Sequence, residues 1–451
     1  MGLAIQKQMI ENHHERIVVG LGKTGLSVAR HLYRQGEPFV MADTRDIPPG
    51  LNNFKKEFPQ LRIFTGAFTE QLFAGVRQII VSPGVDTRHP AIQTAVDQGA
   101  DCIGDIELFA NANEVPVVAV TGSNGKSTVV QLVTEMARAS GLCAYAGGNI
   151  GTPVLDLLDK KDAQLFVLEL SSFQLESTRS LQPRVSAVLN VSADHLDRHE
   201  SLKRYARIKS RIYEHAGSSV VNQDDKLVME MKTSGHVTHF GLGRPTDQGF
   251  GLVQRDTRSY LAQGNHCLLA TDELKMQGES GILNALAALA IGDRMALSMQ
   301  KMLSVLESFK GLPHRLSRVG DSHGVTWFND SKGTNIGASV ASLKSLGSNV
   351  ILLAGGVFKG GDLAHFRTYV AHHAKHVILF GQDSDLLHRA LNDAVQIHSA
   401  DSMRDAVLKA QALSVAGDKV LLSPACASFD MYADYIERGT DFENCVRELV
   451  L

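Results

Sequence analysis

The segment Val117–Thr128, with the sequence VVAVTGSNGKST, constrains the fold more than any other part of the chain. Its apolar first half suits a buried strand and leads directly into a turn that contains Gly122 and Gly125. A helical pattern follows at once. In such a unit the backbone N–H groups of the turn and the positive end of the helix dipole face an anion. The segment therefore predicts a phosphate-binding loop between a strand and a helix.

The side chains of this turn suit a nucleoside triphosphate with its magnesium ion. Lys126 supplies a cation for the outer phosphates, and Ser127 or Thr128 can offer a hydroxyl group to Mg²⁺. Val120 stands at the first glycine position of the usual G-x-x-x-x-G-K-[ST], which leaves the shorter form G-x-x-G-K-S-T. A chance Gly-Lys turn is the alternative, and we favour the nucleotide site.

Length and composition describe an ordinary globular protein. The chain has 451 residues, of which 44% are hydrophobic, and this length is typical of about three domains. The net charge of −3 and the lack of a basic block in the sequence argue against nucleic acid as a partner. We expect no membrane partner either, because the sequence has no long apolar run.

Cysteine usage and the first residues favour the cytoplasm. The cysteines are odd in number and lack metal-like spacing, as is typical of thiols in a reducing compartment: Cys102, Cys143, Cys267, Cys426 and Cys445. The opening MGLAIQKQMIENHHER has no apolar signal-peptide core, and Gln6 does not fit a myristoylation pattern. We expect a cytoplasmic protein.

Short apolar strands alternate with amphipathic helices along the chain, which predicts an α/β fold with mostly parallel sheets. We expect an N-terminal Rossmann-like domain over residues 1–104, a central P-loop-type ATPase domain over residues 105–311, and a C-terminal Rossmann-like domain over residues 312–451. The break Gly311-Leu312-Pro313 marks the second boundary.

Apolar runs indicate where the strands lie. The strands expected outside the phosphate-loop segment are Ile17–Gly20, Pro38–Ala42, Gln78–Val81, Leu165–Glu169, Ala187–Val191, Ser218–Asn222, Thr326–Phe328, Val350–Ala354, His376–Phe380 and Lys419–Leu422. Leu26–Gln35 predicts a helix, and the alanine-rich segment Ile282–Ala296 predicts a buried one. The more polar segment His236–Leu274 predicts a small antiparallel addition to the central sheet.

A second glycine-rich turn lies in the first block. Gly20–Gly25 matches G-x-G-x-x-G after a strand, and Asp43 ends the next strand where a dinucleotide-binding fold places its ribose carboxylate. The turn fits a nicotinamide dinucleotide, another nucleotide diphosphate, or a tight turn without a ligand. Ser82-Pro83-Gly84 ends a further strand and is expected at the same sheet edge, as a ligand loop or a plain one.

Acidic and imidazole groups follow two strands of the central block. Glu169 ends a strand beside the phosphate loop and can hold Mg²⁺ directly or through water, although a solvated strand-end acid is the alternative. Asp194 and His195 follow the next strand and suit metal binding or proton transfer. Lys209, in the basic stretch Lys203–Arg211, has on its own the character of a solvated cation.

Three polar loops follow strands of the third block. They are Asn329–Asn335, Gly355–Asp362 and Ser423–Asp430. Each alone can be ordinary turn chemistry, but together at one sheet edge they predict a small-molecule site.

Taken together, these motifs resemble the Mur ligase family of peptidoglycan synthesis. The resemblance rests on GLGKTGLS at Gly20, TGSNGKST at Thr121, LELSSFQLE at Leu168, NVSADHLDRH at Asn190, GLPHR at Gly311, NDSKGTN at Asn329 and SPACASFD at Ser423. The first-block motifs GLGKTGLS, DTR at Asp43 and SPG at Ser82 resemble the branch that adds D-glutamate.

The resemblance implies an ATP-dependent ligase that joins D-glutamate to UDP-N-acetylmuramoyl-L-alanine through an acyl phosphate and releases ADP and phosphate. It also implies that the first domain binds the UDP part of the substrate and that no nicotinamide takes part. We expect a monomer with small-molecule substrates.

The resemblance also assigns residues to each ligand. For the UDP substrate they are Lys23, Thr24, Asp43, Thr44, Arg45, Ser82, Pro83, Gly84 and Asn149. For ATP they are Gly122, Ser123, Asn124, Gly125, Lys126, Ser127, Thr128, Asn284, Arg315 and Asp330. For D-glutamate they are Lys332, Thr334, Lys359, Ser428 and Phe429, with Tyr435 as an aromatic neighbour.

The catalytic residues implied by the resemblance are Lys126, Glu169, His195 and Lys209. Mg²⁺ would be held through Ser127, Glu169 and His195, and Lys209 matches a lysine that is carbamylated in the family and positions a second Mg²⁺. The alternatives left open are a sister ligase with another amino acid, a nicotinamide-dependent oxidoreductase, and an ATP-gated binding module without catalysis.

Overall fold

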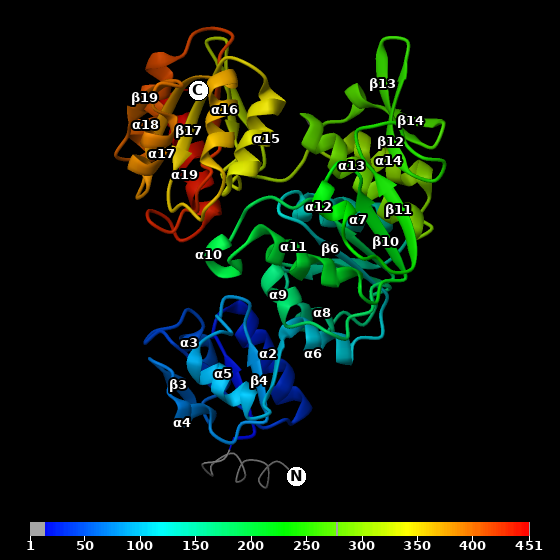
Figure 1. Ribbon diagram of the computed structural model, residues 1–451, viewed down its shortest axis with the longest axis vertical. Helices are drawn as coiled ribbons and strands as arrows, with labels where there is room; N and C mark the ends of the chain where they lie inside the picture. Colours follow the sequence, from blue (N-terminus) through cyan, green and yellow to red (C-terminus); the bar gives the residue numbers. More distant parts are fainter. Residues whose placement is uncertain (1–13, 277, 451) are drawn as a thin grey trace.

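The computed structural model describes residues 14–276 and 278–450, which form three α/β units along the chain (Figure 1). The first unit lies at one end, the central unit in the middle, and the C-terminal unit beside the far part of the central unit. Within the described residues no helix is long and apolar enough to cross a membrane. The opening residues 1–13, on which the expectation about a signal peptide rested, lie outside the described part.

The first unit contains a five-stranded parallel sheet in the order β3-β2-β1-β4-β5. Its strands are β1 (Arg16–Val19), β2 (Val40–Asp43), β3 (Ile63–Thr65), β4 (Gln78–Val81) and β5 (Asp101–Gly104). Its helices are α2 (Lys23–Gln35), α3 (Leu51–Glu57), α4 (Glu70–Phe73) and α5 (Pro90–Asp97). The chain order reverses between β1 and β4, so the loops after these strands open a crevice suited to a ligand.

The central unit contains a nine-stranded sheet in the order β14-β13-β12-β11-β10-β9-β6-β8-β7. Its strands are β6 (Val117–Thr121), β7 (Ala144–Gly148), β8 (Leu165–Glu169), β9 (Val185–Val188), β10 (Ser218–Asn222), β11 (His236–Phe240), β12 (Phe250–Arg255), β13 (Arg258–Gln263) and β14 (His266–Ala270). Strand β6 lies between β8 and β9 and is buried along its length, as its apolar sequence predicts.

Helices cover the faces of the central sheet and pack on its apolar strands (Figure 1). They are α6 (Asp105–Ala112), α7 (Lys126–Ala139), α8 (Val154–Leu157), α9 (Ser172–Glu176), α10 (Leu196–His199), α11 (Leu202–Ser210), α12 (Lys226–Met229), α13 (Gly278–Arg294) and α14 (Met299–Ser308), with short 3-10 turns η1 (Arg211–Tyr213) and η2 (Thr271–Glu273). Ala285–Ile291 of α13 is fully buried, so the expected buried helix is confirmed.

The C-terminal unit contains a six-stranded sheet in the order β15-β16-β20-β17-β18-β19. Its strands are β15 (Ser317–Ser322), β16 (Val325–Asn329), β17 (Val350–Gly355), β18 (Ala374–Phe380), β19 (Gln396–Ser399) and β20 (Lys419–Leu422). Its helices are α15 (Ile336–Leu346), α16 (Leu363–His373), α17 (Ser384–Leu391), α18 (Met403–Leu413) and α19 (Tyr435–Leu449). The three sheets confirm the predicted α/β class; the exact domain boundaries stay predictions.

One predicted strand is displaced. The expected strand Ala187–Val191 is β9, Val185–Val188, and Leu189–Val191 leaves the sheet. Leu189 and Val191 stay buried, but their N–H groups donate to the carbonyl of Thr121 and to the carboxylate of Asp225, at 2.9 and 2.7 Å. Leu189 thus keeps one hydrogen bond to the end of β6, and the apolar residues beyond Val188 mark burial beneath the phosphate loop more than strand pairing.

The polar segment after β10 is also more varied than predicted. Strand β11 pairs parallel with β10, whereas β12, β13 and β14 form the expected antiparallel addition. The sequence of this segment carries no signal for the direction in which its first strand, β11, pairs.

The apolar core links the first two units. One cluster of buried side chains lies on both sides of the unit boundary and includes Val18, Leu26, Phe109, Phe166 and Tyr213. The opposite face of the first sheet, by contrast, packs on side chains of the first unit, such as Ile79 and Ile92. Both clusters of the C-terminal unit contain only residues of that unit.

Candidate functional site: a phosphate loop shared by three units

The phosphate loop is a tight turn between β6 and α7. Gly122 and Gly125 have φ values of 154° and 86°, and a Cβ atom on Gly125 would lie 2.4 Å from Oδ1 of Asn284. Asn190 holds the loop from below: its Oδ1 accepts from the backbone N–H of Asn124 at 2.9 Å, and its Nδ2 donates to the Asn124 carbonyl at 3.1 Å. These contacts fix the path of the loop, as the glycine pattern predicts.

Lys126 lies at the start of α7 and turns back over the loop. Its Nζ donates hydrogen bonds to the carbonyls of Gly122 and Ser123, at 2.8 and 2.9 Å. Burial lowers the pKa of Lys126, and the carboxylates of Glu169 and Asp194 oppose that shift. The ammonium group therefore lies against the loop, within reach of the outer phosphates of a nucleotide bound there.

A chain of hydrogen bonds runs through Ser127 and crosses to the C-terminal unit. Ser127 Oγ donates to Glu169 Oε2 at 2.5 Å, and the Arg315 guanidinium donates to Ser127 Oγ at 2.6 Å. Asn149 Nδ2 donates to the other oxygen of Glu169 at 2.7 Å. The structure thus brings together four residues that the sequence motifs assign to ATP, metal and substrate, and they come from separate segments.

The pair formed by Ser127 and Glu169 suits a small hard cation. A hydroxyl group and a carboxylate oxygen are the ligands that Mg²⁺ accepts in nucleotide sites, where phosphates and water complete the shell. Within residues 14–276 and 278–450 no group of three or more carboxylate, imidazole or thiol side chains converges as a metal site. The donor set therefore fits a metal that a phosphate ligand completes, and the metal ligands stay predictions.

The position of Lys209 differs from the one that its neighbours in the sequence suggest. The side chain, taken there as a solvated cation, is buried, with 1% of its surface exposed. Its Nζ donates to the Gly122 carbonyl at 2.9 Å and lies 4.4 Å from the ring of Tyr205. Burial, with the charge of Lys126, lowers its pKa well below the usual value. The amphipathic spacing of α11 points this lysine inward, which the basic composition of the helix concealed.

His195 and Asp194 link the central unit to the C-terminal unit. Asp194 is buried and accepts from Nζ of Lys359 at 2.8 Å and from Nδ2 of Asn335 at 3.0 Å. His195 Nε2 lies 3.7 Å from Asp194 Oδ1, and its ring packs edge-on against Phe173 at 5.0 Å. Although burial alone would raise the pKa of Asp194, Lys359 and His195 outweigh it and hold that pKa low.

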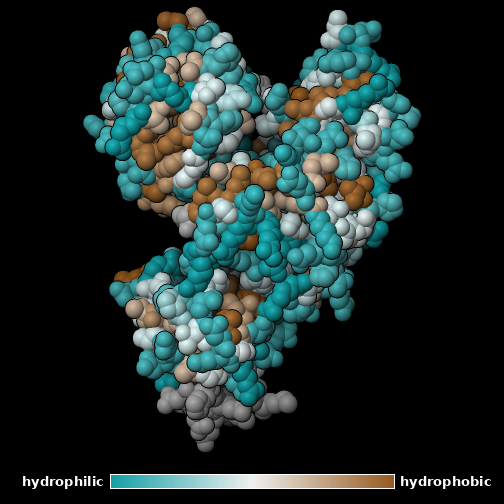
Figure 2. Space-filling model, in the orientation of Figure 1, coloured by the Kyte–Doolittle hydropathy of each residue, from teal (hydrophilic) through white to brown (hydrophobic). Residues whose placement is uncertain are grey.

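A cleft of about 870 Å³ opens from the phosphate loop between the central and C-terminal units. Figure 2 shows the surface notched between these two units. The cleft brings together the residues predicted for ATP outside the loop with members of the loop itself: Asn124, Gly125, Thr128, Asn284, Arg315 and Asp330. Burial raises the pKa of Asp330 to about 6, partly offset by hydrogen bonds from Ser342 and Ser423.

The residues predicted for the UDP substrate gather at the carboxyl edge of the first sheet. Asp43 accepts from the Leu21 N–H at 2.7 Å and forms two hydrogen bonds with the Arg45 guanidinium, at 2.8 and 2.7 Å. Ser82 Oγ donates to the Gly20 carbonyl at 2.9 Å, which joins the loops after β1 and β4. The others on this edge are Lys23, Thr24, Thr44, Pro83 and Gly84, whereas Asn149 lies in the central unit beside Glu169.

The residues predicted for D-glutamate lie on loops of the C-terminal unit. Lys332 Nζ lies 3.8 Å from the centre of the Tyr435 ring, and burial together with Arg315 lowers its pKa to about 8. Lys332 also lines the nucleotide cleft. Thr334 is half-buried, Ser428 is buried, and Phe429 is 74% exposed. The loops that carry them all follow strands of one sheet edge, as predicted.

Arg438 is a structural contributor that the sequence did not reveal. Its buried guanidinium donates to the carbonyls of Ser331, Cys426 and Gly355, at 2.9, 3.2 and 3.5 Å, and so contacts all three loops of this edge. Burial lowers its pKa to about 10. A single arginine in an amphipathic helix gives no signal of this role, because its position behind the loops depends on tertiary packing.

Comparison with known proteins agrees with these observations. The N-terminal domain model of MurD-like Mur ligases matches residues 14–104, the Mur ligase middle domain matches residues 120–292, and the Mur ligase glutamate ligase domain matches residues 314–426. The UDP-N-acetylmuramoylalanine–D-glutamate ligase of Nitrosococcus oceani is 44% identical over 96% of both chains. That of Marinobacter nauticus is 45% identical over 98% of this chain and 100% of its own.

Solved structures support the fold. A pseudomurein peptide ligase type C from Methanothermus fervidus covers 96% of this chain and 100% of its own with a TM-score of 0.61 at 18% identity. UDP-N-acetylmuramate–alanine ligase from Thermotoga maritima covers 97% of this chain and 100% of its own with a TM-score of 0.61 at 17% identity. Together with the matches to all three units, these likenesses show that the protein belongs to the Mur ligase family.

Proposed function

We propose that the chain is an ATP-dependent ligase that joins D-glutamate to UDP-N-acetylmuramoyl-L-alanine in peptidoglycan synthesis. The observation that carries this function is the meeting of three segments at the phosphate loop: Lys126 of the loop, Lys209 of α11, and Arg315 of the C-terminal unit. Relatives with this activity in their names match the chain over nearly its whole length, which supports the choice of amino acid and acceptor.

A carboxylate is a poor electrophile, so the reaction starts by activation. An oxygen of the L-alanyl carboxylate attacks the γ-phosphorus of ATP and the bond to ADP breaks, which leaves an acyl phosphate. Lys126 offsets the negative charge that gathers on the phosphates. Arg315 donates a hydrogen bond to Ser127 and so attaches the C-terminal unit to the phosphate loop, where the nucleotide would bind.

Amide formation follows when the amine of D-glutamate attacks the acyl carbon. The C–O bond to phosphate breaks, the amine loses a proton, and inorganic phosphate leaves. In this proposal Lys332, Thr334, Lys359, Ser428 and Phe429 hold D-glutamate. Asp43, Arg45 and the Ser82–Gly84 loop hold the uridine diphosphate. Alignment of groups from three units raises their effective concentration strongly.

Mg²⁺ belongs to the same proposal. When bound, it neutralises phosphate charge during the transfer. The chain would supply Ser127 and Glu169, which are already in contact, with His195 as a further ligand. Lys209 is the proposed site of carbamylation: its buried amine, whose pKa is lowered by burial, would attack carbon dioxide in its unprotonated form to form a carbamate and release a proton.

Phosphate release tests the proposed reaction. Purified protein is supplied with ATP, Mg²⁺ and UDP-N-acetylmuramoyl-L-alanine, and each candidate amino acid is added in turn. We expect phosphate release to depend on D-glutamate. Release that prefers L-lysine or ignores D-glutamate would contradict the proposed specificity and favour a sister ligase, and a change in nicotinamide absorbance would favour an oxidoreductase.

A further inference from the structure

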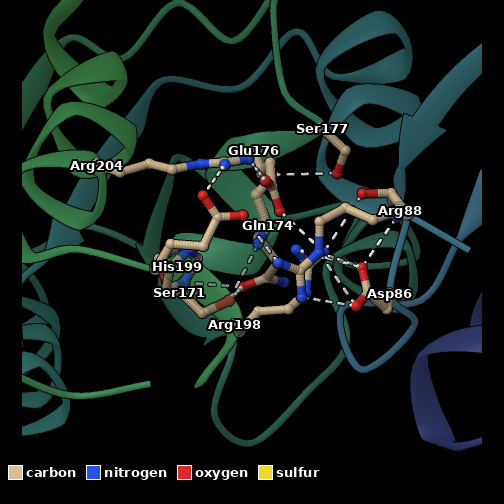
Figure 3. Close-up of polar contacts among 12 residues, drawn as sticks. Asp86, Arg88, Ser171, Gln174, Glu176, Ser177, Arg198, His199 and Arg204 are labelled. Atoms are coloured by element: carbon tan, nitrogen blue, oxygen red, sulfur yellow. Dashed lines mark hydrogen bonds and ion pairs between the residues drawn. The ribbon is translucent and has the colours of Figure 1, made fainter. Parts of the chain in front are cut away.

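A network of ion pairs joins the first unit to the central unit beside the candidate site (Figure 3). At its centre the Arg198 guanidinium lies 3.5 Å from an oxygen of Asp86 and 3.1 Å from an oxygen of Glu176. It also donates to the Thr87 hydroxyl at 3.3 Å. Only 11% of the Arg198 side chain is exposed, so this arginine is fixed by both units.

Each partner of Arg198 belongs to a loop or helix that follows a predicted ligand residue. Asp86 and Thr87 follow the Ser82–Gly84 loop, and the hydrogen bond from the Val85 N–H to the Ser82 carbonyl makes that connection a tight turn. Glu176 ends α9, the short helix after Glu169. Arg198 itself lies one turn beyond His195, on α10. One guanidinium, carried on the segment after His195, thus contacts the extensions of two other predicted sites.

Aromatic packing makes the link to His195 rigid. The Phe173 ring lies 5.8 Å from the Arg198 guanidinium and 5.0 Å from the His195 ring, and it stacks on His199 at 5.1 Å. His199 Nε2 is in turn 2.9 Å from the Ser172 hydroxyl. The Phe173 ring thus lies between Arg198 and His195 and contacts both side chains.

This network connects the two units on the side of their interface where apolar packing is incomplete. A cavity of about 160 Å³ lies beside it, and its lining includes Ser82, Pro83, Phe173 and Arg198. The other side of the same interface is held by the shared apolar cluster and by the exposed ion pair of Arg34 with Asp159 at 2.6 Å. On the Ser82 side polar contacts take the place of apolar packing: the ion pairs of Arg198 with Asp86 and Glu176, and the more exposed pair of Arg88 with Glu200 at 3.1 Å.

We propose that Arg198 is a positioning residue, which fixes the loop for the UDP end of the substrate relative to the loop that carries His195. The proposal rests on the proposed function, since it assumes that the substrate spans these two loops. Its chemical role is to set the place at which the acceptor carboxylate meets the γ-phosphate. An error of about 1 Å there can cost about 100-fold in rate.

The test compares Arg198→Met with a matched variant, Arg34→Met. Both remove a guanidinium that pairs across the same two units, but Arg34 lies away from the Ser82 loop and its side chain is 44% exposed. We expect Arg198→Met to lower kcat about 10- to 100-fold. The dissociation constant for UDP alone should stay unchanged, because the first unit binds it by itself. Arg34→Met should keep kcat within about twofold.

Two further variants keep the proposal open to contradiction if Arg198→Met fails to fold. Asp86→Asn removes the partner charge from an exposed loop, and Arg198→Lys keeps a charge of different shape. We expect Asp86→Asn to lower kcat in the same direction, and Arg198→Lys to retain more activity than Arg198→Met. The double variant of Asp86→Asn and Arg198→Met should lose less activity than the product of the two single effects, since both changes remove the Arg198–Asp86 pair; Asp86→Asn also weakens the pair of Asp86 with Arg88.

The outcomes separate the proposals. Wild-type kcat in Arg198→Met, or an equal loss in Arg34→Met, would overturn the positioning role. Weaker binding of UDP-N-acetylmuramoyl-L-alanine with unchanged kcat would also overturn it, since Arg198 would then be a substrate-binding residue. Absence of D-glutamate-dependent release from the wild type contradicts the proposed function instead. The variants are then compared with the amino acid that does support release.

Discussion

At the scale of single residues, the site depends on charged side chains that the fold buries beside each other. Lys126 and Lys209 both donate to the carbonyl of Gly122. Burial is the main cause of the lowered pKa of each amine. The positive charge of Lys126 lowers the pKa of Lys209 further, because two like charges repel in a buried place. Both shifts make loss of a proton from this pair of amines easier than from an exposed lysine.

Removal of the Lys209 amine should therefore stop the reaction without unfolding the chain. We expect Lys209→Ala to lower kcat by about 100-fold or more, as loss of a group that places charge at a transferring phosphoryl does. Lys203→Ala is the control, because Lys203 lies on the same helix and is exposed. Mass spectrometry of gently treated protein should show an added carbon dioxide that Lys209→Ala lacks; wild-type kcat in Lys209→Ala would contradict the assigned role.

Asp105, at the start of α6, gives a prediction on stability. Burial raises its pKa to about 6, and Gln174 provides a hydrogen bond at 3.2 Å. Between the unfolded pKa of about 3.9 and the folded value, the folded state holds a proton that the unfolded state has lost. Stability due to this group therefore falls as pH rises through that window, and the cost above pH 6 is on the order of 3 kcal/mol.

We expect Asp105→Asn to remove this cost. Its melting temperature should exceed that of the wild type at pH 7.5, and the difference should disappear near pH 4, where both side chains are neutral. Asp97→Asn, at an exposed position of α5, is the control and should show no such pH-dependent difference. A melting-temperature difference that is the same at both pH values would show that the carboxylate charge is not the cause.

At the scale of elements, the end of β9 positions the phosphate loop. The strand stops at Val188, and the residues that follow turn their polar groups toward the loop. The Asn190 side chain makes the paired hydrogen bonds with Asn124 that a neighbouring strand would make with its backbone. The loop is thus held in shape from the sheet below it.

Loss of this support should weaken nucleotide binding. We expect Asn190→Ala to raise the KM for ATP about 30-fold, because two hydrogen bonds of about 1 kcal/mol each are lost. Asn113→Ala is the matched control: Asn113 makes the same kind of paired contact with the backbone of Val115, at 2.7 and 3.1 Å, away from the loop. An equal rise in both variants would indicate a general effect on stability.

Strands buried on both faces could be predicted from the sequence, whereas partly exposed strands at the sheet edges could not. Gln78–Val81, Leu165–Glu169, Ser218–Asn222 and Lys419–Leu422 match their strands to the residue, because each is an apolar run bounded by polar turns. The edge strands β15 and β19 were not predicted, since their residues are partly exposed. The strand predicted at Ala187–Val191 runs past the end of β9 because the residues after Val188 are also apolar and buried.

The site divides in the same way. The phosphate loop, Glu169 and the polar loops follow strands, so their meeting at sheet edges could be predicted from the chain order alone. The inward direction of Lys209, the crossing of Arg315 to Ser127 and the role of Arg198 depend on how units pack, and local sequence carries no signal for this. The family resemblance identified Lys209 and Arg315, whereas only the structure identified Arg198.

At the scale of the whole molecule, the three units are not equally independent. The first unit shares one of its two apolar clusters with the central unit, whereas the C-terminal unit has both clusters to itself. The C-terminal unit meets the central unit where α15 lies against α13, and through polar contacts such as Asp194 with Lys359 and Ser127 with Arg315. Burial of apolar surface is the main source of stability, so these units should respond differently to isolation.

We expect residues 312–451 to fold alone and residues 1–104 to remain unfolded when expressed alone. The first fragment keeps its cores complete, whereas the second loses the central-unit members of the cluster to which its Val18, Leu26 and Phe54 belong. Dispersed amide signals in nuclear magnetic resonance spectra and a cooperative melt distinguish the two states. A folded fragment 1–104 would show that its remaining cluster suffices.

A C-terminal unit that is complete in itself also affects how such chains can diversify. Recombination between related genes near residue 312 would join two separate cores, so chimaeras should need repacking only where α15 meets α13. A junction near residue 104 would instead cut through a shared interior and require compensating changes on both sides. The amino acid that is added should therefore be the property most readily exchanged between relatives, and the nucleotide-bound acceptor the one most strongly retained.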